Sequence, residues 1–369
     1  MLSYYKKNPF NILSYWRISL DVRQNIPVRI RIASILLSLI FGILISLLII
    51  NNAGVDLQSI YEEFLVFTFF NSDGLATVVV ESTPLIIVGL SAAVAFRVNF
   101  WNIGIEGQIF LGVIGATLVA IYDIGPEFLR LPLMLIFALI FSGLWAFPPA
   151  YLKVKLKINE VITTLLLNYL AFYFVLNQVY GAWKDPVDKF PHSEQYETFE
   201  RLNKIGWEDV SWGVVISILT VVLIWWLLER SKFGVKSKFC GINPSMAFAI
   251  GLPVSLITII SAVTSGALSG LAGFVIATAY EFRLTPQIAL GYGFSGIVIA
   301  FLAGNRSLAV VIVSFLIGGL YVACDSLKVF YNLPSALVGL IQSIIVLSIA
   351  TSEFFIRYRM KLSIKKGLN

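Results

Sequence analysis

The chain has 369 residues, of which 58% are hydrophobic and only 13% are charged, and its mean hydropathy is +0.86. An ordinary soluble domain carries about 25% charged residues, so this composition excludes a soluble globular protein and indicates one embedded in a membrane. The formal net charge is +6, but 20 of the 27 lysines and arginines fall in alternate connecting segments. That bias is a mark of membrane topology and not of nucleic-acid binding.

Ten apolar stretches follow one another along the chain, each long enough or nearly long enough to cross a bilayer. We therefore predict an all-α polytopic membrane protein with spans at 32–50, 75–97, 103–122, 131–150, 158–181, 211–228, 254–278, 289–303, 307–323 and 335–352. The eighth stretch is short for a hydrocarbon core of about 30 Å. We expect it to be a buried or half-crossing helix that its neighbours screen from lipid.

Basic residues predict the orientation. With the N-terminus inside, the ten spans place 20 lysines and arginines on the cytoplasmic side and 7 outside. The positive-inside rule then puts both termini in the cytoplasm. We expect a multi-pass protein of the plasma (inner) membrane. We expect a cytoplasmic segment at 1–31, one transmembrane domain at 32–356 and a basic cytoplasmic tail at 357–369. An external loop at 182–210 and a cytoplasmic loop at 229–253 interrupt the domain.

The sequence offers little enzymatic chemistry. It lacks the glycine-rich loop ending in Gly-Lys-Ser or Gly-Lys-Thr that cradles phosphates, so any ATP must be bound by a partner, and no cofactor of its own is expected. No histidine or cysteine spacing is typical of a metal site. The best cluster is Asp185, Asp188, His192 and Glu194 in the external loop. The Asp185-Pro186 step favours a solvated turn, with a divalent cation or catalysis as the alternative.

Three acidic residues lie close to the predicted spans. Glu81, Glu106 and Glu160 are expected at or near span ends, whereas a proton relay would need deeper, paired carboxylates. Glu160 follows Asn159, which suits the start of a helix. An ion-coupled secondary carrier and a polytopic membrane enzyme both remain open as interpretations.

Small residues recur at a spacing of four in three spans: Gly266 with Gly270, Gly89 with Ala93, and Gly112 with Ala116. Such faces let helices approach closely in lipid. The pattern predicts a dense bundle in which any pathway is narrow.

Two segments interrupt the apolar pattern. Residues 96–108 join spans two and three with hardly any loop, and their polar side chains and glycines stand where a helix begins. Free N–H groups there can face a polar solute, as at the broken helices of transporters; a plain capped helix start is the alternative.

The second segment, residues 243–251, reads as a short helix with both ends marked. Asn243 suits the N-cap, Pro244 the first helical position and Gly251 the residue after the end. Its body carries no charge although it is expected in the cytoplasm. An apolar knob of this kind fits a groove on a partner protein, and insertion into the lipid interface is the alternative.

Several motifs occur in a recognisable order. They are Asn102–Gln108, Asn159–Ile162, Leu167–Tyr169, Gly181–Pro186, Gly241–Pro244, Ser265–Gly273 and Gly291–Phe294. With them the chain resembles, over roughly residues 75–357, the permease subunits of bacterial ABC importers of the branched-chain amino acid and simple-sugar class. Within that class it resembles the branch that takes up nucleosides.

The resemblance implies a type II ABC importer permease fold with about ten helices. It also implies three kinds of partner besides membrane lipid: a second permease, identical or homologous; cytoplasmic ABC ATPase subunits that bind and hydrolyse ATP; and an external solute-binding protein. No nucleic acid is implied. The expected solute is a nucleoside first and a ribose-like sugar next.

Polar groups at the broken helix start, aromatic rings beside Gly291 and Gly293 and the capped, uncharged helix at 243–251, together with the resemblance, suggest roles for particular residues. Those expected to line or shape the solute route are Asn102, Glu106, Gln108, Asn168, Tyr292 and Phe294. Those expected to couple the permease to the ATPase are Asn243, Pro244, Met246, Phe248, Ala249 and Gly251. Ser245, Met246 and Phe248 depart from the usual family pattern, which bears on the choice of ATPase partner.

Overall fold

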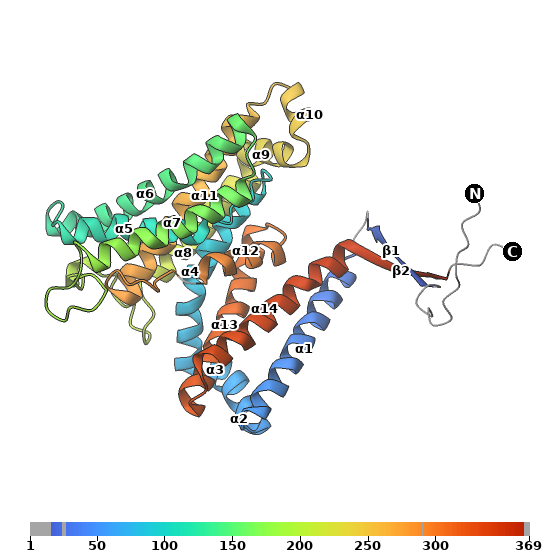
Figure 1. Cartoon of the computed structure of the whole chain (residues 1–369), viewed down its shortest axis with the longest axis horizontal. Helices are drawn as coiled ribbons and strands as arrows, with labels where there is room; N and C mark the ends of the chain where they lie inside the picture. Colours follow the sequence, from blue (N-terminus) through green and yellow to red (C-terminus); the bar gives the residue numbers. More distant parts are fainter. Residues whose placement is uncertain (1–15, 24–26, 290, 365–369) are drawn as a thin grey trace, which may run out of the picture. The chain divides into compact units, whose positions relative to one another are not determined.

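The computed structural model describes residues 16–23, 27–289 and 291–364 (Figure 1). Eight helices of this part of the chain are long and apolar enough to cross a membrane, and two shorter apolar helices, Ile105–Ile121 and Tyr292–Leu302, accompany them. Each of the ten predicted spans coincides with one of these helices, so the all-α membrane fold is confirmed. The chain divides into unit 1, formed by the described residues of Met1–Ile50 and Ser343–Asn369, and unit 2, Asn51–Gln342.

Unit 1 combines two helices with a two-stranded ribbon. Its helical part comes from α1 (Val28–Asn52) and the second half of α14 (Ser335–Arg357), and a Cβ added at Gly42 would lie 2.9 Å from Ser348 Cβ. Strands β1 (Trp16–Val22) and β2 (Tyr358–Ile364) pair antiparallel, with Trp16 opposite Ile364. This ribbon was not predicted, because strands about 340 residues apart give no local pairing signal.

The centre of unit 2 is α4 (Ser72–Phe96), whose residues from Ser82 onward are all buried. Four helices pack around it: α8 (Gly213–Trp225), α11 (Val254–Ile276), α12 (Tyr292–Leu302) and α13 (Ser307–Tyr331). A helix that is apolar on all sides must be enclosed by others or by lipid. Here the neighbouring helices of the same chain enclose it.

A second buried helix, α5 (Ile105–Ile121), packs against α6 (Glu127–Leu156), α7 (Glu160–Tyr180) and α11. The α5 and α11 backbones approach closely, because a Cβ built on Gly112 would lie 2.5 Å from Gly270 Cα. The predicted small-residue spacing therefore marks real helix contacts, as expected for helices that associate in lipid.

Shorter elements complete unit 2. Before α4 come α2 (Leu57–Tyr61), the π-helical η2 (Glu62–Phe67) and α3 (Thr68–Phe70); the 3-10 turn η3 (Thr198–Glu200) lies in the loop after α7; and the π-helical η4 (Trp226–Arg230) and η5 (Ala277–Glu281) extend α8 and α11. Helices α9 (Lys232–Ile242) and α10 (Pro244–Ala249) lie together beyond one end of α6 and α11 (Figure 1).

The eighth span is as short as its sequence indicates. Helix α12 has 11 residues, and at a rise of about 1.5 Å per residue it reaches about 16 Å, roughly half of a hydrocarbon core. It packs against α4, α5 and α13, and its middle residues Ser295, Gly296, Ile299 and Ala300 are buried against them.

The contact between α5 and α11 gives a test of packing. We expect Gly112→Ala to lower the thermal stability of the detergent-solubilised protein, because the new methyl group meets the Gly270 backbone and overpacking costs about 1–3 kcal/mol. Gly339→Ala is the matched control, since it is also helical and its added Cβ meets no described atom within 4 Å. Equal melting temperatures for the two variants would contradict the close approach.

Candidate functional site

The segment between α4 and α5 turns back into the bundle. Asn99 has a left-handed backbone with φ of 53°, which reverses the chain after α4. Phe100 and Asn102 are then fully buried, at 0% exposure each. Helix α5 therefore begins inside the protein, and its first N–H groups need partners that water cannot supply.

Asn102 and Gln108 face each other across this helix start. Asn102 Nδ2 lies 2.9 Å from Gln108 Oε1, and Gln108 Nε2 lies 3.0 Å from Asn102 Oδ1. Ser265 and Ser269 of α11 bond to the pair at 2.9 and 3.2 Å, and the Ser91 hydroxyl of α4 bonds to both serines. All five side chains are buried. Their polar atoms satisfy one another, so they hold the connection to α4 and α11 and do not face open space.

One face of α7 supplies acceptors for the same connection. Glu160, Thr164 and Asn168 are spaced by four residues and so lie on one side of the helix. Each accepts a backbone N–H: Trp101 N–H donates to Glu160 Oε1 at 3.3 Å, Ile103 N–H to Thr164 Oγ1 at 3.2 Å, and Gly107 N–H to Asn168 Oδ1 at 2.9 Å. Asn168 Nδ2 also donates to the Ile103 carbonyl at 2.8 Å. The Asn-Glu and Leu-Asn-Tyr motifs thus meet the Asn-Ile-Gly motif in space.

Glu106 links the start of α5 to the start of α12. Its Oε1 accepts the Gly291 N–H at 3.1 Å, while its Oε2 has no hydrogen-bond partner among the described residues. Gly293 packs so tightly that an added Cβ would lie 2.5 Å from Glu106 N. A carboxylate beside a helix N-terminus is favoured by the helix dipole. Glu106 therefore joins two helices that both begin within the bundle.

Tyr292 of α12 contacts Glu81 of α4, an acidic residue that the sequence predicts too close to the end of its span. Tyr292 Oη donates to Glu81 Oε2 at 3.2 Å, and both side chains are half-buried. Glu81 is nine residues from the start of α4, about 14 Å along it, so the prediction that Glu81 lies at or near a span end is wrong. The cause is that α4 begins at Ser72 and not at residue 75.

Two further residues extend this polar group. Ser295 Oγ lies 2.6 Å from Tyr321 Oη of α13, and Phe294 is 48% exposed on the same α12 turn. Sequence reasoning named Glu81 without a role in the route, and it missed Ser295 and Tyr321. The available signal was an acidic residue within an apolar helix, which by default faces a bundle interior or a water-filled cavity.

The external-loop cluster brings two carboxylates and an imidazole together beside a guanidinium. Asp185, Asp188 and His192 come together, with His192 Nε2 2.9 Å from Asp188 Oδ2, whereas Glu194 is not part of the cluster. Arg283 Nη1 lies 3.1 Å from His192 Nε2. A guanidinium in that position repels a divalent cation, and the interpretation as an ordinary turn is therefore kept.

Helix α10 has the predicted ends. Asn243 Oδ1 accepts the Met246 N–H at 3.0 Å, Pro244 is the first helical residue, and Gly251 has φ of +82° just after the end. Ala247 is buried, whereas Met246 is 56% and Phe248 75% exposed. The helix is thus fixed on one side and presents two large apolar side chains on the other.

Comparisons with known proteins identify the family to which the chain belongs. Residues 74–350 match the family described as branched-chain amino acid transport system / permease component. The chain belongs to this family. It is therefore a multi-pass membrane protein, the permease component of an ABC transporter, and the predicted resemblance is confirmed.

Curated relatives cover most of the permease. The guanosine ABC transporter permease protein NupP of Bacillus subtilis is 31% identical over 90% of this chain and 97% of its own length. The glucose ABC transporter permease protein TsgB13 of Haloferax volcanii is 28% identical over 95% and 96%. The nucleoside ABC transporter permease protein NupB of Lactococcus lactis is 26% identical over 85% and 89%. Among solved structures, PsaBC from Streptococcus pneumoniae in complex with Fab aligns with a TM-score of 0.45 at 17% identity, covering 80% of this chain and 94% of that one.

The loop after α7 is fastened to the permease by buried polar contacts that the sequence did not reveal. The Tyr196 hydroxyl lies 2.6 Å from Thr117 Oγ1 of α5, and burial raises the pKa of the Tyr196 phenol, which keeps it protonated. Arg130 Nη1 of α6 pairs with Glu200 Oε1 at 3.0 Å, with both side chains buried. This loop is therefore a fixed surface.

The contribution of the α7 face that carries Glu160, Thr164 and Asn168 to stability can be tested by comparing two asparagines of that helix. We expect Asn168→Leu to destabilise the permease by about 1–3 kcal/mol, because the Gly107 N–H and the Ile103 carbonyl each lose a buried partner. Asn177→Leu changes an exposed position of the same helix and is expected to have little effect. Thermal unfolding in detergent measures the stability of both variants, and equal stability would show that the Asn168 hydrogen bonds are dispensable.

Proposed function

We propose that this permease forms half of the translocation pathway of an ATP-driven importer and that its solute is a nucleoside. The observation that carries the proposal is the half-length helix α12, which starts beside Glu81 and Glu106 and presents Tyr292 and Phe294. Discontinuous helices with polar groups at their ends are how transporters build solute sites within the membrane. The names of relatives from Bacillus subtilis and Lactococcus lactis support the solute class.

The predicted route residues divide into two roles. Asn102, Gln108 and Asn168 are buried and bonded to one another or to backbone, so they shape the route by fixing where α5 begins. Tyr292 and Phe294 are partly exposed and line it, and Glu106 positions them through Gly291. To these we add Glu81, which is half-buried and bonded to Tyr292.

This group suits a nucleoside. A carboxylate oxygen accepts hydrogen bonds from ribose hydroxyls, and an aromatic ring stacks on a base with about 0.5–1.5 kcal/mol beyond the area buried. A neutral sugar such as glucose is the second candidate, because the Haloferax volcanii relative is named for it. Both solutes offer hydroxyl groups, and only the nucleoside offers a flat base for Phe294.

Replacing Tyr292 tests the lining. Tyr292→Phe keeps the ring and removes the hydroxyl that bonds Glu81. A hydrogen bond from that hydroxyl to the solute would be worth about 1 kcal/mol, so its loss is expected to raise the KM for uptake about fivefold. Radiolabelled guanosine uptake by the complete transporter measures it, and unlabelled glucose as competitor separates the two solute classes. Tyr173→Phe on the exposed side of α7 is the control. An unchanged KM for Tyr292→Phe would remove this hydroxyl from the route.

Energy is proposed to enter through α10. The chain carries no Gly-Lys-Ser or Gly-Lys-Thr phosphate loop, so ATP would be bound and hydrolysed by separate ABC ATPase subunits. The ends of the helix are set by Asn243, Pro244 and Gly251, and its last residue is Ala249. The side chains proposed to enter an ATPase groove are the exposed Met246 and Phe248. ATPase closure would then bias a two-state membrane element through this contact.

The orientation of the permease follows from its basic residues. The split of 20 to 7 supports an orientation with α10 and both termini in the cytoplasm, and the proposed location is the plasma (inner) membrane. The fastened loop at 182–210 would then face outward, where an external solute-binding protein docks. A second permease, identical or homologous, would complete the pathway.

Phe248 tests the coupling contact. Burying such an anchor contributes about 1.5–3 kcal/mol, so Phe248→Asp is expected to release the ATPase on purification or to abolish solute-stimulated ATP hydrolysis. Phe248→Leu keeps an apolar side chain and is expected to retain most of both. Size-exclusion elution of the membrane part checks that the fold survives. A Phe248→Asp complex with wild-type ATPase content and turnover would favour insertion of α10 into the lipid interface.

A further inference from the structure

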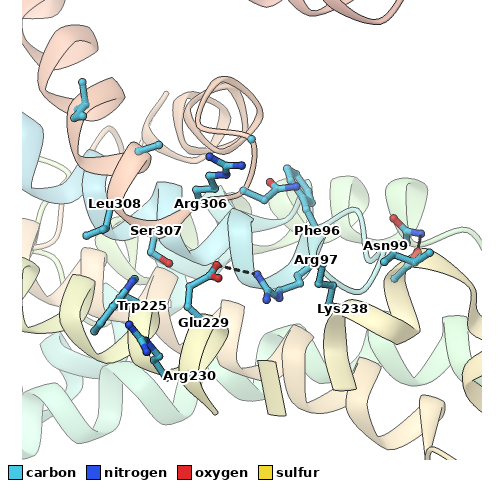
Figure 2. Close-up of a pocket in the computed structure, with 16 residues that line it drawn as sticks. Phe96, Arg97, Asn99, Trp225, Glu229, Arg230, Lys238, Arg306, Ser307 and Leu308 are labelled. Atoms are coloured by element: carbon cyan, nitrogen blue, oxygen red, sulfur yellow. Dashed lines mark hydrogen bonds and ion pairs between the residues drawn. The ribbon is translucent and has the colours of Figure 1, made fainter. Parts of the chain in front are cut away.

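A cavity of about 1030 Å³ has in its lining none of the proposed solute-route residues and no residue of α10. It is bounded by the end of α8 with η4, by α9, by the residues that follow α4 and by the turn between α12 and α13 (Figure 2). All of these elements belong to unit 2. One part of its lining is strongly basic and another part is apolar, and the two parts predict what it binds.

The basic part holds four cationic side chains and one acid. Arg97 is engaged within the protein: its Nη1 lies 3.3 Å from Glu229 Oε1 and its Nη2 donates to the Leu228 carbonyl at 2.6 Å. The other three cations are Arg230, Lys238 and Arg306, and none of them pairs with a carboxylate among the described residues. Figure 2 shows these side chains around the cavity, drawn from segments far apart in the sequence.

The start of α13 adds unused donors to this basic part. Ser307, Leu308 and Ala309 line the cavity and form the first turn of the 25-residue helix, so their N–H groups have no acceptor earlier in the helix. The Ser307 side chain is 1% exposed, and its hydroxyl has no partner among the described residues. A buried hydroxyl without a partner is costly, and a helix N-terminus attracts anions. Together they indicate a bound anion.

The apolar part of the lining faces outward. Leu308 and Ile312 lie one turn apart on α13 and are 59% and 66% exposed, and Trp225 of α8 lies in the same wall. Exposed apolar side chains on spanning helices suit contact with the hydrocarbon of the bilayer. The occupant therefore needs an anionic head for the basic part and an apolar tail for this part.

We propose that this cavity binds an anionic phospholipid of the cytoplasmic leaflet, with its phosphate against Arg306, Lys238 and the first turn of α13 and its acyl chains along Leu308 and Ile312. The assignment of leaflet rests on the proposed orientation, whereas the head and tail contacts do not. Basic pockets between spanning helices on this side of a membrane recognise lipid head groups. Because Lys238 lies on α9, directly before α10, the lipid would anchor the segment that carries the coupling helix.

The test compares phosphatidylglycerol with phosphatidylcholine of identical acyl chains, titrated into the purified complex and counted by native mass spectrometry. The wild type is expected to prefer phosphatidylglycerol. Each basic contact with an anionic lipid is worth about a fivefold change in affinity, so Lys238→Gln with Arg306→Gln should weaken phosphatidylglycerol binding about 30-fold and leave phosphatidylcholine unchanged. Both substituted residues are exposed, so the fold should survive, and size-exclusion elution checks this.

The matched control is Lys232→Gln with Lys236→Gln, which removes the same charge from exposed positions of α9 outside the cavity. This control should keep the wild-type preference. The proposal is overturned if the wild type binds both lipids equally, if the cavity variant keeps its preference, or if the control loses it too. Full competition by inorganic phosphate at equal concentration would overturn it in favour of a free-phosphate site. None of these outcomes bears on nucleoside uptake, which is measured separately.

Discussion

The backbone N–H groups at the start of α5 are the constraint on which the rest of the site depends. Helix α5 begins inside the bundle, where water cannot satisfy its first donors, and a buried unpaired N–H carries the full cost of its desolvation. Side chains from α7 supply the acceptors. The Asn102 and Gln108 amides bond to each other and to serines of α11, which in turn bond to Ser91 of α4. Four segments of the chain are thereby held in one arrangement.

That arrangement decides where the second internal helix can begin. Glu106 belongs to the first turn of α5 and reaches the backbone of Gly291, so a fixed α5 implies a fixed α12. The close packing of Gly293 against Glu106 leaves no room for the two helix starts to slide. Tyr292 is then carried to Glu81 on α4. A polar network that does not itself contact the solute can in this way position the side chains that are proposed to contact the solute.

The end of the permease that carries α9 and α10 does not depend on this buried network. The short helix α10 is set by local chemistry, with an asparagine cap, a proline and a glycine in the left-handed region. The neighbouring cavity depends on residues contributed by four separate segments, and its basic character comes from cations that lack carboxylate partners among the described residues. Coupling and lipid contact are therefore proposed for adjoining surfaces, with α9 as the shared element.

The ten helices, the ends of α10 and the membership of a permease family could be predicted from the sequence, because hydrophobic runs, caps and ordered motifs are local signals. It also named Asn102, Gln108 and Asn168, but their polarity at a helix start fitted a solute contact and an internal bond equally well. The packing of the helices shows that these amides bond to each other and to backbone, and that Glu81 lies well inside its helix. The paired strands at residues 16–22 and 358–364, the Tyr196 and Arg130 contacts and the basic cavity likewise join residues far apart in the chain. Such pairings depend on how helices pack, which no single segment encodes.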